Sequence, residues 1–220
     1  MTESAMPRVE VLHLPLGPLQ TNCYILADIN TGQAVIIDPA WDGRKIAQTI
    51  SDKGWQLSAI WLTHAHFDHV GGLAELQQLA PDVPVAIHPD AVPMLHAASQ
   101  RPIMEHRGRA PEEPDVMLSA EQTLRLGDLT IDVLFTPGHA PGHVCFYLAE
   151  QNLLFDGDVL FQQSIGRTDL PGGDYELLMT SIREKVLVLP DETVVLSGHG
   201  PATTIGDERQ YNPFLADLNR

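Results

Sequence analysis

Apolar residues along this chain gather in short runs bounded by turn residues, a pattern typical of β-strands. In the N-terminal part, the runs VEVLHLPL (9–16), NCYILAD (22–28) and QAVIIDPA (33–40) are rich in β-forming residues. Asn30 and Gly32, between the second and third runs, form a turn signal. This pattern predicts a meander of three strands.

Other segments show the period of an amphipathic helix, with apolar residues three or four positions apart. One begins at Asp42, a favourable N-cap residue, and continues to about Lys53 with Ile46 and Ile50 one turn apart. Another begins at Asp174 and places these apolar residues on one face: Tyr175, Leu178, Met179, Ile182 and Val186. Further helices are predicted over residues 71–80, 90–99 and 204–212.

The remaining apolar runs complete the order of elements. Strands are predicted over residues 57–62, 83–89, 129–138, 142–150, 152–158 and 191–200. Residues 100–115 show no period and contain several prolines and charges, so they are predicted to form a long loop. No repeat or linker interrupts this order, and we expect one α/β domain with two sheets over residues 1–220.

Composition narrows the classes of partner. The chain has 220 residues, 44% of them hydrophobic, which is enough for a sizeable core. Its formal net charge is −16 at pH 7. Nucleic acids and anionic membranes are bound mainly through Lys and Arg, so we expect neither as a partner, and a nuclease is disfavoured.

The start of the chain and its cysteines favour a cytoplasmic protein. The first residues, MTESAMPRVE, lack the basic and apolar regions of a signal peptide, and no apolar run approaches the ~18 residues of a membrane span. Cys23 and Cys145 form no CxxC motif. Two reduced, buried thiols are therefore a simpler expectation than a disulfide between them, while the oligomeric state stays open.

The segment LTHAHFDHVGG (62–72) carries the densest chemistry, with His64, His66, Asp68 and His69 just after a predicted strand. In an extended backbone, alternate side chains point the same way, so the first three would converge and His69 would point elsewhere. Such an arrangement suits two neighbouring metal ions better than one.

Further candidate ligands stand at strand ends beside glycines, at His139, His143, Asp156, Asp158 and His199. Imidazole and carboxylate ligands suit zinc, iron and manganese, and the cluster contains no cysteine of the kind found in closed structural sites. We therefore expect a catalytic metal site.

Some of these residues have a simpler interpretation. A lone histidine at a strand end is more often a capping or satisfied polar residue than a ligand, and this interpretation is preferred for His13, His88, His96, His106 and His139. Asp156 is expected to stabilise a turn or to lie behind the ligands.

In combination and in this order, THAHFDHVGG, PGHAPGHV, DGDVLF and SGHG resemble the metallo-β-lactamase superfamily over essentially the whole chain. The resemblance implies a four-layer αββα sandwich, with two mixed sheets face to face and metals at one edge. It also implies two divalent metal ions, zinc in the first place, with iron and manganese as alternatives.

The resemblance further implies a role for each candidate residue. The first metal would be held by His64, His66 and His143, and the second by Asp68, His69 and His199. Asp158 would bridge the two metals. Asp38 would lie behind the ligands and orient a ligand histidine by accepting its other ring N–H.

The segments SIGRTDLPGGD and SGHGPATTIGDERQYNPFL resemble the short form of glyoxalase II, a hydroxyacylglutathione hydrolase, and the end of the chain at Arg220 fits a form without the C-terminal helical domain. The implied substrate is S-lactoylglutathione or a related hydroxyacyl thioester. Arg167 stands where long enzymes carry a glutathione-binding lysine, and would pair either with a substrate carboxylate or with Asp169. Pro201 departs from the long form, which has a tyrosine there.

The implied mechanism is attack of a metal-bound hydroxide on the thioester carbonyl, with either Asp68 or Asp158 passing a proton and Asp68 preferred. Two other classes stay open. The run GRTD also resembles persulfide dioxygenases, which hold one iron through the equivalents of His64, His143 and Asp158. A non-catalytic metal-binding module is disfavoured because all seven ligand positions are filled.

Overall fold

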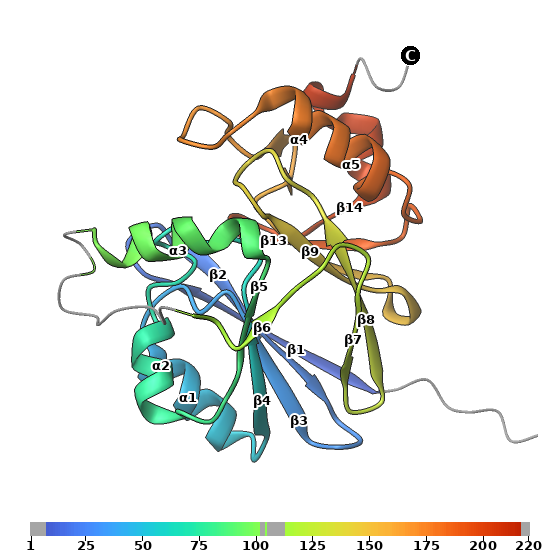
Figure 1. Cartoon of the computed structure of the whole chain (residues 1–220). Coiled ribbons are helices and arrows are strands. Elements are labelled where there is room, and N and C mark those ends of the chain that lie inside the picture. The colour runs from blue at the N-terminus through green and yellow to red at the C-terminus, as the bar shows by residue number, and fades with distance from the viewer. Residues whose placement is uncertain (1–7, 102–103, 105–112, 217–220) are drawn as a thin grey trace, which may run out of the picture.

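The computed structural model of the chain describes residues 8–101, 104 and 113–216. Within these ranges, two six-stranded sheets pack face to face, and helices cover the outer face of each sheet (Figure 1). The predicted αββα sandwich with mixed sheets is therefore confirmed. Most of the loop predicted over residues 100–115 lies outside the described residues.

The first sheet is built from the N-terminal half of the chain and begins with the predicted three-strand meander. Its strands, in spatial order, are β1 (Val9–Leu16), β2 (Thr21–Asp28), β3 (Gln33–Ile37), β4 (Gln56–Trp61), β5 (Val85–Ile87) and β6 (Val116–Met117). The first three strands are antiparallel, and β3 to β6 are parallel. Its outer face carries α1 (Gly43–Asp52), α2 (Leu73–Leu79) and α3 (Val92–Ser99), the last preceded by the 3-10 turn η1 (Pro89–Ala91).

The second sheet comes from the C-terminal half. Its strands, in spatial order, are β14 (Thr203–Thr204), β13 (Val194–Ser197), β10 (Leu153–Gly157), β9 (Val144–Leu148), β8 (Leu129–Phe135) and β7 (Thr123–Leu126). A small hairpin adds β11 (Leu160–Phe161) and β12 (Ser164–Ile165). Its outer elements are α4 (Tyr175–Ser181) with the π-helical turn η4 (Ile182–Val186), α5 (Ile205–Tyr211) and the 3-10 turn η5 (Pro213–Leu215), while the 3-10 turn η3 (Ala149–Gln151) connects β9 to β10.

Alternation along single strands builds the apolar layers of the sandwich. In β2, Cys23 and Ile25 face the layer under α1 to α3, while Tyr24 and Leu26 face the layer between the sheets. Successive side chains of a strand point to opposite faces, so a strand covered on both sides is buried throughout. Cys145 lies in a third layer, under α4 and α5, so the two cysteines belong to different layers and both are free thiols.

The predicted caps are present. The side chain of Asp42 accepts the N–H of Lys45 at the start of α1, and that of Asp174 accepts the N–H of Leu177 at the start of α4. Tyr175, the first residue of α4, is 48% exposed, while the other members of its predicted face are buried. Among the described residues, no helix is long and apolar enough to cross a membrane.

Candidate metal centre

The histidine-rich loop begins directly after β4, whose last residues are buried and hold the loop at the edge of the first sheet. The backbone N–H of His69 donates to the carbonyl of His66 at 3.0 Å, so the chain turns here and is not extended. This turn contradicts the expectation that His64, His66 and Asp68 converge. His64 and His66 join one group of ligands, while Asp68 joins another with His69.

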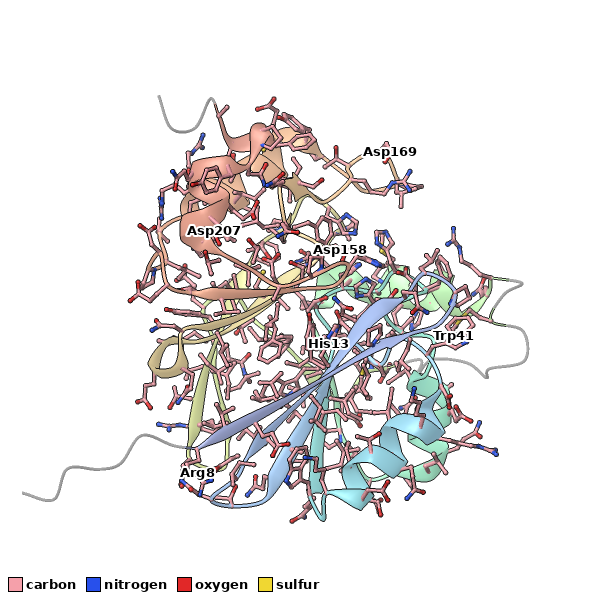
Figure 2. All side chains as sticks on the ribbon, turned by 180° about the vertical axis from the view of Figure 1, so that it is seen from behind. Arg8, His13, Trp41, Asp158, Asp169 and Asp207 are labelled. Carbon is pink, nitrogen blue, oxygen red and sulfur yellow. The ribbon has the colours of Figure 1, made fainter. Side chains whose placement is uncertain are left out.

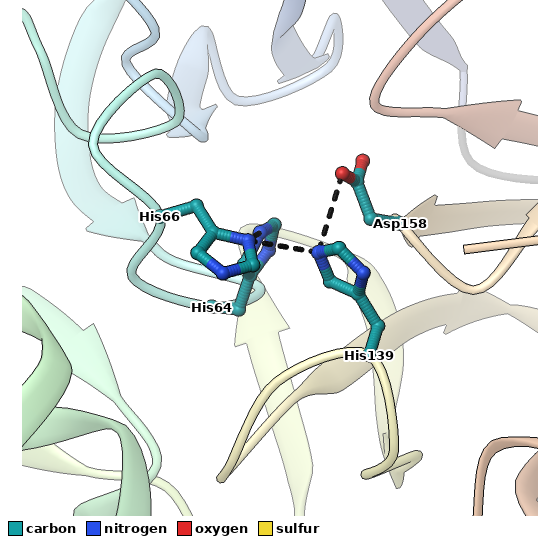
Figure 3. Close-up of side chains that lie close together, drawn as sticks. All are labelled: His64, His66, His139 and Asp158. Carbon is teal, nitrogen blue, oxygen red and sulfur yellow. Dashed lines mark hydrogen bonds and ion pairs between the residues drawn. The ribbon is translucent and has the colours of Figure 1, made fainter. Parts of the chain in front are cut away.

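The first ligand group comprises His64, His66, His139 and Asp158, whose ligand atoms all lie within 4.8 Å of one another (Figure 3). Nδ1 of His66 lies 3.0 Å from Nε2 of His64 and 2.8 Å from Nε2 of His139. Oδ2 of Asp158 lies 3.4 Å from Nε2 of His139. Three imidazole nitrogens and one carboxylate oxygen thus face a common centre.

The hydrogen bonds behind this group determine which ring nitrogens are free. The hydroxyl of Thr63 donates to Asp38 at 2.6 Å, so it accepts from Nδ1 of His64 at 3.0 Å. Nδ1 of His139 donates to the carbonyl of Arg167 at 2.8 Å. In the neutral rings, Nε2 of His64 and Nε2 of His139 are therefore unprotonated, the form that binds a metal.

The second ligand group comprises Asp68, His69 and His199. Nε2 of His199 lies 3.2 Å from Oδ2 of Asp68, and Nε2 of His69 lies 3.7 Å from the same oxygen. Nδ1 of His69 bonds to Oδ2 of Asp38 at 2.9 Å, which leaves Nε2 to face the group. Asp38 thus lies where its predicted role behind the ligands requires.

Asp158 lies between the two groups. Its Oδ2 is 3.4 Å from Nε2 of His139 and 3.6 Å from Nε2 of His199, and its Oδ1 is 3.4 Å from Nε2 of His69. Both Oδ1 of Asp158 and Nε2 of His69 are buried without a hydrogen-bond partner among the described residues. Such atoms are costly to bury unless an ion satisfies them. The donor set therefore fits a pair of divalent metal ions.

Two glycines allow the strand ends to approach so closely. A Cβ on Gly198 would lie 2.3 Å from Oδ1 of Asp158 and 2.6 Å from Cε1 of His69. A Cβ on Gly157, where φ is +54°, would lie 2.6 Å from Nε2 of His143. A side chain at either position would displace the residues that face the metal centre.

The structure does not place His143 among the ligands, contrary to the prediction. Its Nε2 accepts the backbone N–H of Asp158 at 3.1 Å, and its Nδ1 lies 3.0 Å from the hydroxyl of Thr136. Both ring nitrogens are engaged, and neither is left for a metal. His143 thus supports Asp158, and its predicted place is taken by His139.

His139 is the functional residue that the sequence argument missed, because it was expected to be a satisfied polar residue. A signal for it was present in the order of elements. His139 follows the end of β8 and a glycine, as the other ligands follow their strands, whereas His143 directly precedes β9. Because β8 and β9 are antiparallel, both histidines lie at the same edge of the sheet, and the hydrogen bonds of their rings decide which one faces the metal centre.

The other lone histidines mostly match their simpler interpretation. Nε2 of His13 lies 2.6 Å from Oδ1 of Asn22, and Nδ1 of His88 accepts the N–H of Asp90 at 3.2 Å. His96 lies on α3, outside the ligand groups found among the described residues, and His106 lies outside those residues. As expected, Asp156 stabilises a turn, accepting the N–H of Leu160 at 2.7 Å.

Burial sets the charge of the first ligand group. Burial, together with the neighbouring His139, lowers the pKa of His66 to about 4. Burial also lowers the pKa values of His64 and His139, with further lowering by neighbouring histidines. These rings are neutral near pH 7 and need to lose no proton before they bind a metal.

Carboxylates set the charge of the second ligand group. Burial opposes the ionisation of Asp68, yet its hydrogen bond with His199 and the charge of His69 hold its pKa well below the usual range. Burial likewise opposes the protonation of His69, but Asp158 and Asp38 raise its pKa. The pKa of His199 is also raised, because its bond with Asp68 outweighs burial. Without metal, this group holds protons.

The start of β2 supports the second ligand group from behind, a role that the sequence did not suggest. The hydroxyl of Thr21 donates to Oδ2 of Asp68 at 2.8 Å. The backbone N–H of Asn22 donates to Gly198 at 2.8 Å, and its side-chain amide donates to Ser197 at 2.8 Å and to Gly200 at 2.9 Å. Asn22 thereby fixes the loop that carries His199.

A cavity of about 520 Å³ opens beside the two ligand groups. His66, Asp68, His139, Asp158 and His199 reach its wall, and most of the remaining lining is apolar. A cavity of this size suits a small molecule, and its floor would place a substrate group against the metal ions.

Comparison with known proteins identifies the family of this chain. The model of the metallo-beta-lactamase superfamily matches residues 16–199 of the chain. The chain belongs to this superfamily. The match extends through every residue of both ligand groups, from β1 to His199.

Two relatives align with nearly the whole length of this chain. A Bacillus subtilis (strain 168) protein named "Probable metallo-hydrolase YqgX" is 46% identical over 204 residues, which is 92% of this chain and 95% of the relative. A Haemophilus influenzae protein named "Hydroxyacylglutathione hydrolase GloC" is 38% identical over 207 residues, 92% of this chain and 96% of the relative.

Two solved structures are similarly close. The BLEG-1 B3 metallo-beta-lactamase is 42% identical with a TM-score of 0.86, and the match covers 94% of this chain and 100% of that one. TTHA1623 in a di-iron-bound form is also 42% identical, with a TM-score of 0.79, covering 93% of this chain and 100% of that one. A pair of metal ions in a structure so similar agrees with the two ligand groups seen here.

Proposed function

We propose that the protein is a metal-dependent thioester hydrolase of the glyoxalase II type, which cleaves S-lactoylglutathione or a related hydroxyacyl thioester. The observation that carries the proposal is the meeting of two ligand groups at Asp158, on the wall of one cavity. The identity of 38% to a protein named as a hydroxyacylglutathione hydrolase supports the thioester as substrate class.

Two bound divalent ions would supply Lewis acidity and a water whose pKa is lowered toward neutrality. The residues of the chain prepare the site for this chemistry. His64, His66 and His139 would hold the first ion, Asp68, His69 and His199 the second, and Asp158 would contact both. The thiolate of a thioester leaves readily, so the chain needs no strong general acid.

Asp68 is the residue that we propose for proton transfer. It lies on the cavity wall, and Thr21 and His199 orient the carboxylate through Oδ2. Its depressed pKa keeps it ionised at neutral pH, so it can accept a hydrogen bond from the attacking water and would hold a proton only transiently.

A second candidate function is β-lactam hydrolysis, which the 42% identity to the BLEG-1 enzyme favours. It would use the same ligand groups. Persulfide oxidation with one iron is a weaker alternative, because the chain also presents a full second ligand group of Asp68, His69 and His199.

The test compares three substrates on protein of measured metal content. Thiol release from S-lactoylglutathione, opening of a chromogenic cephalosporin and oxygen uptake with glutathione persulfide are followed in parallel. We expect two equivalents of metal and thiol release as the fastest reaction by at least about tenfold, a rate ratio that corresponds to ~1.4 kcal/mol. Faster turnover of either other substrate would replace the thioester proposal with the corresponding function.

A further inference from the structure

The walls of the metal-site cavity carry two arginines. Among the described residues that line it, Arg101 and Arg167 are the cationic side chains other than histidines. With a net charge of −16, the protein as a whole repels an anionic substrate. The metal ions would attract the reacting end of the substrate, so a carboxylate further along it needs positive charge on the cavity wall, and the two arginines are the candidates to supply it.

The charge of Arg167 is already engaged. Its Nε and Nη2 donate to the two carboxylate oxygens of Asp169 at 2.7 Å and 2.8 Å, a bidentate pair. The guanidinium lowers the pKa of Asp169 to about 2, so the acid stays ionised. Figure 2 shows Asp169 on a loop that projects from the C-terminal part of the molecule. Of the two partners foreseen for Arg167, Asp169 is the one it contacts.

Arg101 is held in a different way. Its guanidinium carbon lies 4.8 Å from the centroid of the Phe67 ring, a cation–π contact. This contact uses no hydrogen bond of the guanidinium, so its N–H groups remain available to an acceptor. None of the ion pairs found among the described residues includes Arg101.

Phe67 connects the position of the Arg101 guanidinium to that of the metal ligands. It stands between His66 and Asp68 in the loop, so one ligand of each group is its direct neighbour in the chain. Its ring and Arg101 both line the cavity. The guanidinium is therefore placed by the same loop that places the metal ligands.

The helix before Arg101 forms an apolar path along the cavity. Met94, Ala97 and Ala98 lie on one face of α3 and line the cavity, and Arg101 continues this face one turn further. The N–H of Arg101 donates to the carbonyl of Ala98 at 3.2 Å, which extends the helical turn. Arg101 is itself exposed, so its charge lies where the apolar path opens to solvent.

We propose that Arg101 binds a carboxylate on the thiol portion of the substrate and makes the enzyme selective for anionic thioesters. The inference rests on the proposed thioester hydrolysis. A thioester carbonyl at the metal centre would leave the longer, thiol portion of the substrate to follow the α3 face toward Arg101. The ligand class is therefore a thioester whose thiol is extended and carries a carboxylate.

The test is a ratio of specificities. S-Lactoylglutathione and the lactoyl thioester of N-acetylcysteamine share the acyl group, but only the first carries carboxylates. In Arg101→Gln, we expect kcat/KM for the anionic substrate, relative to the neutral one, to fall about 30-fold, as the loss of one charge-assisted hydrogen bond predicts. The loss should lie mostly in KM, and Arg101→Lys should recover part of it.

Matched variants separate this role from a general effect of charge. Arg125→Gln removes an exposed arginine that bonds to Thr130 on the second sheet, and it should leave the ratio unchanged. Arg167→Gln should change the ratio less than threefold, well below the effect of Arg101. Phe67→Leu, with its metal content checked, should lower the ratio while keeping the arginine. An unchanged ratio in Arg101→Gln, or an equal loss for both substrates, would overturn the proposal.

Failure of the proposed function has a different signature. A fully metallated protein that cleaves neither thioester contradicts thioester hydrolysis itself. Binding of S-methylglutathione, an inert carboxylate probe, then tests Arg101 alone by calorimetry. Weaker binding to Arg101→Gln than to the unaltered protein would support the anion site, and equal binding would overturn it.

Discussion

The two ligand groups of the metal centre are built from opposite chemistry. The first sets three imidazoles around one carboxylate, and burial among other rings lowers the pKa of its histidines. In the second, His69 and His199 stand among carboxylates, and their pKa values are raised. The first group therefore repels protons and the second retains them.

This difference teaches that the two metal sites are not equivalent. A metal ion entering the first group meets neutral rings with oriented lone pairs, while one entering the second group must displace protons. We expect the first site to be filled before the second.

The largest effect should come from removing the residue that joins the two groups. Asp158→Ala deletes a carboxylate that lies 3.4 Å from both His139 and His69. Thioester hydrolysis should fall by roughly 10³-fold, since the loss of one partner of a buried charged cluster costs ~4 kcal/mol. Metal analysis should show that both ions are bound more weakly, and circular dichroism should show an unchanged fold. Full activity in a folded Asp158→Ala variant would remove the case for a shared centre.

A matched pair of histidine variants sharpens the assignment of the first group. His139→Ala removes a direct ligand, so the first metal and nearly all activity should be lost. His143→Ala removes only the support of Asp158, and a supporting partner of a metal ligand is worth about 10- to 100-fold. Metal content of the two variants, measured side by side, is the readout. The reverse order of effects would restore His143 as the ligand.

The second group should respond to a residue that touches no metal. Asn22→Ala cuts two side-chain hydrogen bonds to the loop of His199, at Ser197 and Gly200. We expect the affinity for the second metal to fall about tenfold, while the first metal is retained. Titration of the metal-free variant with zinc measures both steps. An equal loss of affinity for the first and the second metal would show that Asn22 supports both ligand groups and not the second group alone.

The smallest effect is expected from pH. A histidine of raised pKa keeps its proton to a higher pH, so protons should displace the second metal first as the pH falls. The first group contains His66, with a pKa of about 4, and should keep its ion to lower pH. Metal content after dialysis at stepwise lower pH should show two separate losses. A single loss of both ions would mean that the groups act as one.

Much of the fold could be predicted because long elements carry a clear period. The strands from β1 to β4, the cap of α1 at Asp42 and the cap of α4 at Asp174 were all predictable. Pairings of two residues, such as β6, β11 and β12, are too short to show a period. They form because neighbouring chain segments are brought beside them by the sheets.

The candidate site could be predicted in part, because several of its ligands are neighbours in the sequence. His64, His66, Asp68 and His69 stand together in the sequence, and their density alone indicates a metal site. Choosing between His139 and His143 requires knowing which ring nitrogens are occupied, and those bonds come from Thr136, Arg167 and the backbone of Asp158. These partners lie on three separate segments, so the spacing of the histidines does not determine the choice.

By itself, the sequence determined the main strands and helix caps and the types of ligand atom, because alternation, capping and ligand chemistry are local properties of the chain. The superfamily and the layers of the sandwich followed from the resemblance of its motifs to a known family. The tertiary structure alone decided which histidine is a ligand and that Arg167 pairs with Asp169. It also decided that Arg101 lies on the ring of Phe67 beside the metal loop. Each of these depends on distances and burial between segments far apart in the chain, and hydrogen bonds and charges act over such short distances that only the folded arrangement can set them.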